Sequence, residues 1–318
     1  MRQAGRYLPQ YASLRGGRSI KQIAGDPVVS SEITYAPIRE IGVDAAIVFS
    51  DILLPLACMG LIVDYVENTG PVVKESGNGT VAEEIMDYDP SEDSYDPSRT
   101  ISLFKSEHPE IPVIGFSGGP LTIASYIYSG RSDRDLKGIR KMMAERPEEV
   151  REVLGVLSKA VARLASSQIA AGADAFQVFD SWAASIDHAA FRDYFNTFVN
   201  PVAGSLAGKV PSIYFTLNSS PHIETFRRSS FNCLSVDWKQ DMAEVSRILG
   251  PGKSVQGNLD PEVAGVGGPP VEKATLKILD SMKGRDGHVF NLGHGVLPHT
   301  DPETLRKIVK EVHAYSGK

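Results

Sequence analysis

Cysteine is scarce in this sequence: Cys58 and Cys233 are the only two among 318 residues. Two cysteines this far apart provide no disulfide framework, and they do not have the spacing of a zinc site. Proteins without such a framework are typical of a reducing compartment, so we expect a cytoplasmic protein.

A long uninterrupted apolar run is also missing. The longest apolar stretch, residues 41–63, contains Asp44 and Asp51, and a carboxylate is costly at bilayer depth. The first residues, MRQAGR, do not have the apolar core of a secretory signal. We therefore expect neither a membrane span nor a signal peptide.

Basic residues do not predominate, since 33 Lys and Arg face 39 Asp and Glu and give a net charge of −6. This balance argues against a nucleic-acid partner. The first 25 residues differ, because they contain no acidic residue before Asp26 but five basic ones. Charge alone favours a solvated surface there over a local site for an anionic ligand.

Seven short and nearly continuous apolar runs predict strands that are buried on both faces. They cover residues 45–51, 112–118, 175–181, 212–216, 233–238, 254–260 and 288–293. Helical periodicity fills the intervals, most clearly over 148–171 and after a cap at Thr300 or Asp301. Residues 64–99 are interpreted as an inserted hairpin or long loop.

Strands that alternate with helices predict a parallel sheet with helices outside it. A closed barrel of this kind needs eight strands, and the eighth would have to precede Arg2. No linker or internal repeat divides the sequence, so we expect one domain over residues 1–318.

Polar residues follow several of the predicted strands, where the active site of a barrel lies. They are Asp51, Asp180, Ser181, Asp237, Asn258, Asp260, Asn291 and His294. For Asp237 and Asp260 a capping or structural role is favoured. Lys239, which also follows a strand, is interpreted as solvated rather than as a Schiff-base lysine.

Asp51 lies in a strongly apolar segment, where an ionised carboxylate needs a partner or ligand to offset desolvation. A helix cap is the alternative, and a functional role is slightly favoured.

His294 lies between two glycines that allow close approach of a ligand. Tyr126 alone is a core aromatic by default. Residues 118–120, GGP before a helix, could present backbone N–H groups to an anion.

Together these fragments resemble the uroporphyrinogen decarboxylase family over essentially the whole chain. The matching segments are MRQAGRYLPQY (1–11), VFSDILLPLACMG (48–60), GFSGGPLTIASYIYSG (115–130), FQVFDSWA (176–183), VDW (236–238), QGNLDP (256–261) and NLGHGVLP (291–298). The resemblance implies a single-domain (β/α)8 TIM barrel, usually a homodimer. In that family a helix and most of the first strand precede the first motif, so the resemblance implies that the N-terminal helix and part of the first strand are missing here.

The resemblance implies that the substrate is uroporphyrinogen, whose four acetate arms become methyl groups to give coproporphyrinogen in haem and tetrapyrrole synthesis. It implies neither a metal nor an organic cofactor. It assigns Asp51 to the pyrrole N–H groups, and Arg2 and Arg6 to a basic loop in which Arg2 is the candidate proton donor.

The resemblance also assigns Tyr126, Ser181 and His294 to the substrate carboxylates or to the shape of the cleft.

Two alternative functions stay open. A corrinoid-dependent methyltransferase of the same superfamily would hold zinc through His and Cys, but NLGHG carries no thiol and no His-x-Cys occurs. A non-catalytic tetrapyrrole-binding protein would bind the ligand without releasing CO2.

Overall fold

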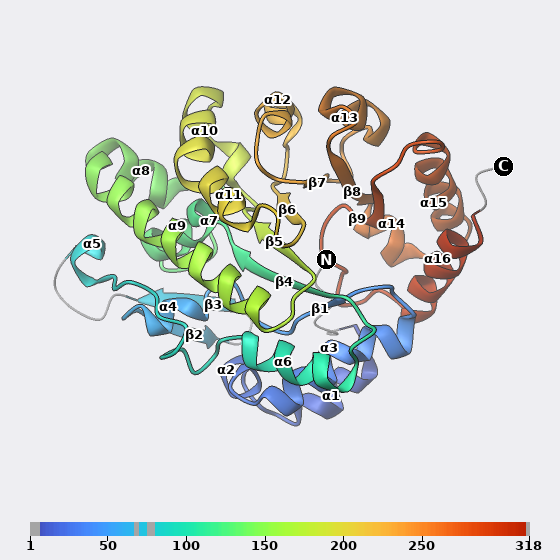
Figure 1. Cartoon of the computed structure of the whole chain (residues 1–318), viewed down its shortest axis with the longest axis horizontal. Helices are drawn as coiled ribbons and strands as arrows, with labels where there is room; N and C mark the ends of the chain where they lie inside the picture. Colours follow the sequence, from blue (N-terminus) through green and yellow to red (C-terminus); the bar gives the residue numbers. More distant parts are fainter. Residues whose placement is uncertain (1–6, 67–69, 75–79, 316–318) are drawn as a thin grey trace.

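A curled sheet of seven parallel strands forms the centre of the protein, in a computed structural model that describes residues 7–66, 70–74 and 80–315. The sheet order is β1 (Ala46–Ile47), β4 (Val113–Gly118), β5 (Ala175–Phe179), β6 (Ser212–Phe215), β7 (Cys233–Ser235), β8 (Ser254–Leu259) and β9 (His288–Leu292). All seven predicted strands are confirmed, each within its predicted run. Helices surround the curled sheet on its outer side (Figure 1).

The sheet has the curvature of a TIM barrel, with β1 and β9 at its two edges. Eight strands are expected for a closed barrel, and the described residues contain seven in this sheet. The predicted eighth strand, ahead of Arg2, falls outside the part of the chain that the structure describes. From Tyr7 onward the chain is packed beside this edge: Tyr7 and Leu8 are buried with Leu292 of β9 and Leu259 of β8.

The outer helices follow the strands in sequence. The longer ones are α3 (Pro27–Ile41), α6 (Ser98–Glu107), α7 (Pro120–Ser129), α8 (Lys137–Glu145), α9 (Pro147–Ala170), α13 (Met242–Leu249), α15 (Pro269–Ser281) and α16 (Pro302–Ala314). Shorter ones are α1 (Pro9–Arg15), α2 (Ile20–Ala24), α4 (Pro55–Cys58), α5 (Val81–Glu84), α10 (His188–Tyr194), α11 (Asn200–Leu206), α12 (Ile223–Arg227) and α14 (Pro261–Val266). Their alternation with the strands confirms the predicted α/β architecture.

Apolar periodicity accounts for the longest of these helices. Helix α9 buries Val150, Val153 and Leu157 against the main core and matches the predicted range to within one residue at each end. Helix α16 begins after Asp301, whose side chain accepts a hydrogen bond from the Glu303 backbone N–H. Of the two caps predicted for this helix, Asp301 is therefore the one that forms.

An antiparallel hairpin, β2 (Ile62–Val66) and β3 (Gly70–Lys74), is inserted between β1 and α6. It confirms the hairpin predicted for this segment, although its first strand starts two residues before the predicted range. Across the described ranges, no helix is both long enough and apolar enough to pass through a bilayer.

Candidate active site

The carboxyl ends of the parallel strands all lie at one edge of the curled sheet, because parallel strands run in the same direction. Four of the six predicted site residues are described there: Asp51 after β1, Tyr126 on α7 after β4, Ser181 after β5 and His294 after β9. The other two, Arg2 and Arg6, lie outside the described residues.

Asp51 is half-buried, and its Oδ1 accepts a hydrogen bond from the Leu53 backbone N–H at 3.0 Å. It closes a turn before α4, whose N-cap residue is Leu54. The alternative of a helix cap is therefore wrong for α4, although the carboxylate does bind a local N–H group. The turn lies against the end of β4, since a Cβ on Gly118 would lie 3.0 Å from the Cβ of Ile52.

Aromatic rings follow one another along the mouth of the barrel. The Phe116 ring centroid lies 5.6 Å from that of Phe179, which lies 6.1 Å from that of Phe215. The His294 ring is next, 5.8 Å from Phe215 and 6.2 Å from Trp238. We call these five side chains, from the ends of β4, β5, β6, β7 and β9, the aromatic arc. Its members other than Phe215 are partly exposed, so the arc offers a broad apolar surface.

Tyr126 and Ser181 are brought together by α7 and the end of β5. The Tyr126 ring lies 5.4 Å from the ring of Trp182, the residue after Ser181. The Ser181 carbonyl accepts a hydrogen bond from the Leu217 backbone N–H at 3.0 Å, which ties this segment to the loop after β6. Phe179 of the aromatic arc lies two residues before Ser181, so the aromatic arc adjoins the group formed by Tyr126, Ser181 and Trp182.

Asp180 is a buried carboxyl group between α7 and the end of β5, which the sequence placed at a strand end without assigning it a role. Its side chain is fully buried and accepts hydrogen bonds from the Thr122 backbone N–H at 2.9 Å, the Tyr214 hydroxyl at 3.0 Å and the Tyr194 hydroxyl. Burial raises the pKa of Asp180, while these hydrogen bonds oppose that rise. Asp180, like Asp51, follows an apolar run, so the cost of desolvating an ionised carboxylate was a signal in the sequence that could have indicated it.

The start of α7 does meet a carboxyl group, but that group, Asp180, belongs to the protein. Thr122 N–H donates to Asp180, and Leu121 N–H donates at 2.8 Å to the Tyr194 hydroxyl, which in turn binds Asp180. Gly119 allows this approach, because a Cβ there would lie 2.2 Å from the Asp180 Cγ. Within residues 118–120, the Gly119 N–H is also bound inside the protein, because it donates to the Phe179 carbonyl at 2.8 Å.

The structural roles favoured for the other strand-end residues are confirmed. Asp260 caps α14 through the Glu262 backbone N–H. Buried Asp237 accepts hydrogen bonds from the backbone N–H groups of Asn218 at 2.6 Å and Lys239 at 2.9 Å. Lys239 itself is exposed, with its Nζ 5.5 Å from the Trp238 ring centroid.

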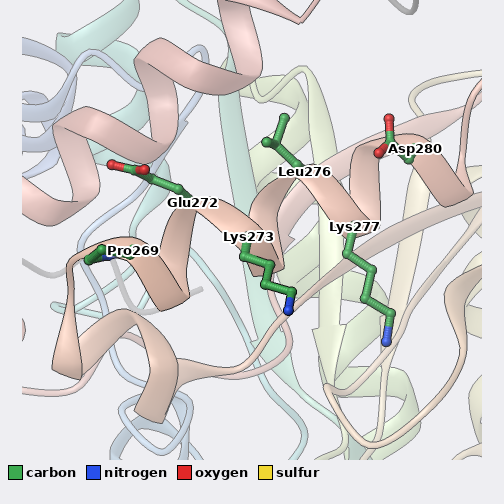
Figure 2. A pocket seen from close by; sticks show the side chains of 6 residues that line it. All are labelled: Pro269, Glu272, Lys273, Leu276, Lys277 and Asp280. Carbon is green, nitrogen blue, oxygen red and sulfur yellow. The ribbon is translucent and has the colours of Figure 1, made fainter.

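A hollow of about 530 Å³ on the surface lies elsewhere, along α15. Figure 2 shows its lining side chains, which all come from this one outer helix: Pro269, Glu272, Lys273, Leu276, Lys277 and Asp280. Two acidic and two basic residues line it, so their charges balance and the hollow favours neither sign of ligand charge. In residues 7–66, 70–74 and 80–315, no group of three or more His, Cys, Asp or Glu is placed to hold a metal ion.

The fold and this edge define an α/β-barrel type of protein whose polar and aromatic side chains gather at the carboxyl ends of its strands. The family model for uroporphyrinogen decarboxylase matches residues 1–315. The chain belongs to the uroporphyrinogen decarboxylase family.

Relatives agree with this assignment. The chain is 38% identical over 314 residues to a uroporphyrinogen decarboxylase from Thermoplasma acidophilum, covering 99% of this chain and 93% of the relative. It is 38% identical to the one from Streptomyces coelicolor, covering 100% and 90%. Against the one from Aquifex aeolicus it is 35% identical, covering 99% and 92%.

Among solved structures, the chain resembles a methyltransferase from Methanosarcina mazei, with a TM-score of 0.77 and 18% identity over 94% of this chain and 89% of that one. A B12-independent methionine synthase from Shewanella is similar at a TM-score of 0.55 and 12% identity, over 91% and 90%. At these identities the likeness concerns the fold alone.

Proposed function

We propose that this protein is a uroporphyrinogen decarboxylase, which converts the four acetate arms of uroporphyrinogen III to methyl groups and yields coproporphyrinogen III in haem and tetrapyrrole biosynthesis. The observation that carries the proposal is the family match over residues 1–315. Asp51, at a strand end, lies in the segment 48–60 that resembles the family. The proposal includes no metal and no organic cofactor.

The reaction needs a place for an electron pair. When the bond between the acetate methylene and its carboxylate breaks, CO2 leaves and the pair enters a pyrrole ring that has been protonated. A proton added to the methylene carbon then completes the methyl group, and the ring gives up its own proton. The intermediate charge on the ring is positive, so a fixed anion beside it lowers the barrier.

Asp51 is proposed to be that anion. Its turn is held by the Leu53 N–H and by contact with the end of β4, so the carboxylate needs little reorganisation to face the pyrrole N–H groups. Preorganised groups of this kind are often worth several kcal/mol, or factors of about 10² to 10³ in rate.

The remaining roles concern a substrate with eight carboxylates. Tyr126, Ser181 and His294 are proposed to donate hydrogen bonds to its arms, and the aromatic arc suits the flat face of a macrocycle. Arg2 and Arg6 are proposed to pair with carboxylates through their guanidinium groups, with Arg2 as proton donor. A basic N-terminal segment on a protein of net charge −6 is consistent with a polyanionic ligand.

We also propose a homodimer in the cytoplasm. The two cysteines, Cys58 and Cys233, are both free thiols, which suits a reducing compartment. The dimer is inferred from family membership alone, and sedimentation at working concentration tests it.

The function is tested by anaerobic incubation with chemically reduced uroporphyrinogen III, followed by oxidation and chromatography of the products. Sequential loss of four carboxyl groups without added metal is expected. Tight binding of the tetrapyrrole with no CO2 release would replace the proposal by the non-catalytic alternative. Stoichiometric zinc together with corrinoid-dependent methyl transfer would replace it by the methyltransferase alternative.

A further inference from the structure

We propose that Asp180 is a positioning residue: its buried carboxylate joins the first turn of α7 to the end of β5 and thereby sets Tyr126 beside Ser181 and Trp182. The inference rests on the proposed function only for its kinetic consequence. Its structural consequence can be measured separately.

The contacts of Asp180 join four segments of the chain. Its Oδ1 accepts from the Thr122 N–H of α7, and its Oδ2 accepts from the hydroxyls of Tyr194 at the end of α10 and Tyr214 on β6. Its own backbone N–H donates to the Phe215 carbonyl at 2.9 Å. An acceptor that is met by three donors in a fully buried position has one well-defined geometry.

The first turn of α7 leads directly to the proposed substrate-binding tyrosine. Thr122 and Tyr126 are four residues apart in one helix, so they lie on the same face. On the other side of the contact, Asp180 is followed immediately by Ser181 and Trp182. The rings of Tyr126 and Trp182 lie 5.4 Å apart. They belong to the two segments that the Asp180 carboxyl group connects.

The chemistry at this position calls for a carboxylate. A carboxylate accepts through both oxygens, whereas an asparagine amide has one acceptor oxygen and an NH2 group. In Asp180→Asn that NH2 faces either the Thr122 N–H, which can only donate, or the two phenol hydroxyls, which must then turn from donors into acceptors and give up their native contacts. The close approach of Gly119 leaves no room for the side chain to move away.

Tryptophan fluorescence measures the structural part directly, because Trp182 and Trp238 are the only tryptophans. In a Trp238→Phe background, emission comes from Trp182 alone. Asp180→Asn is expected to shift the Trp182 emission to the red and to increase its quenching by acrylamide in the folded protein. Unchanged emission and quenching in a folded Asp180→Asn protein would overturn the proposal, whether or not the enzyme turns over.

Kinetics measure the consequence for the substrate. With reduced uroporphyrinogen, Asp180→Asn is expected to raise KM by about tenfold and to lower kcat less, because it misplaces groups that bind the substrate arms. A purely structural carboxylate would lower the melting temperature and leave KM unchanged, which would contradict the proposal. If wild-type protein shows no turnover, the proposed function fails, and the fluorescence result alone decides on Asp180.

Asp174→Asn is the matched control. Asp174 lies at the opposite, amino end of β5, where it is exposed and accepts from the Val113 N–H at 2.8 Å. Its substitution is expected to change neither Trp182 emission nor KM. An equal effect in Asp174→Asn would show that any loss of charge beside β5 suffices, and the proposal would fall.

Tyr214→Phe gives a second test in case Asp180→Asn does not fold. It keeps the ring packed against Phe195 and Phe226 and removes only the hydroxyl that donates to Asp180. The expected result is a smaller shift of Trp182 emission and a smaller rise in KM, both in the same direction. A folded Tyr214→Phe protein with neither change would contradict the proposal.

Discussion

The backbone of Gly293 lies directly against that of Trp238, so that a Cβ on Gly293 would lie 2.3 Å from the Trp238 backbone nitrogen. The Gly293 N–H also donates to the Leu259 carbonyl at 2.8 Å, which fixes it to the end of β8. His294 follows in sequence and has its ring 6.2 Å from that of Trp238. The absence of a side chain at position 293 is therefore what brings His294 into the aromatic arc.

Gly293→Ala is predicted to impair both folding and turnover. Because the atom that would clash is backbone, the added methyl group must push two strand ends apart. Overpacking of this kind costs about 1–3 kcal/mol of unfolding free energy, and the displaced His294 should lower kcat/KM by about tenfold or more. Urea unfolding and steady-state kinetics measure the two effects.

Gly155→Ala is the control, since a Cβ at Gly155 in the middle of α9 meets nothing within 4 Å. It is expected to keep activity and to stabilise the protein by up to about 1 kcal/mol, because alanine favours a helix interior. Wild-type stability in Gly293→Ala would contradict the contact seen between Gly293 and Trp238.

Asp51→Asn is predicted to leave the fold intact and to remove most of the turnover. The amide keeps the size of the side chain and can still accept from the Leu53 N–H, but it does not carry the charge proposed to stabilise the pyrrole cation. The expected loss in kcat is about 10² to 10³-fold, with a melting temperature close to that of wild type. Near-native activity would refute the role assigned to Asp51.

The matched control is Asp260→Asn, which alters another strand-end aspartate. Asp260 caps α14, and asparagine is as good a helix cap as aspartate. This variant should keep both its stability and its kcat. A comparable loss of turnover in Asp260→Asn would show that the barrel mouth responds to any lost carboxylate.

Much of the fold could be predicted because buried parallel strands have a simple pattern. The runs that became β4, β5 and β6 are nearly continuous in apolar residues, and each lies where the apolar pattern places it. Boundaries were less certain, as β1 shows: only Ala46 and Ile47 of the predicted run 45–51 pair as a strand. The residues after them are not part of the strand and lead through Asp51 to α4.

The site was predictable only in part, because side chains meet through strand register. Phe179 faces Phe215 because these two residues are partners in the pairing of β5 with β6, and no single-strand pattern contains that alignment. The contact between Asp180 and α7 likewise depends on Gly119, some sixty positions away in the chain. The sequence could place Asp180 at a strand end, but it could not indicate the three donors that surround it.

Arg6→Ala is predicted to weaken substrate binding more than catalysis. A guanidinium that pairs with a substrate carboxylate contributes to the bound state throughout the reaction, so KM should rise by about tenfold while kcat changes little. Arg15→Ala removes the same charge from an exposed residue of the same basic segment and should leave KM unchanged. An effect of Arg6→Ala on melting temperature alone would instead make Arg6 a structural arginine.

Stability is predicted to fall on mild acidification because of His222. This ring is buried, lies 4.0 Å from the Phe191 ring centroid and has its Nδ1 3.1 Å from that of His188. Burial, with a smaller contribution from His188, lowers the pKa of His222 below its usual 6.5. Burial lowers the pKa of His288 in the same way.

A histidine whose pKa is lowered in the folded protein binds fewer protons there than in the unfolded chain. Below about pH 6.5 the unfolded chain therefore binds protons that the folded protein does not bind. The free energy of unfolding falls as pH falls, by up to about 1.4 kcal/mol per pH unit for each histidine. Urea unfolding at pH 7.5, 6.5 and 5.5 should show a smaller fall for His222→Gln than for wild type. Between pH 7.5 and 8.5, where this histidine is neutral in both states, the two proteins should keep a constant difference. Equal slopes below pH 6.5 would mean that His222 gains its proton as readily in the folded protein as in the unfolded chain.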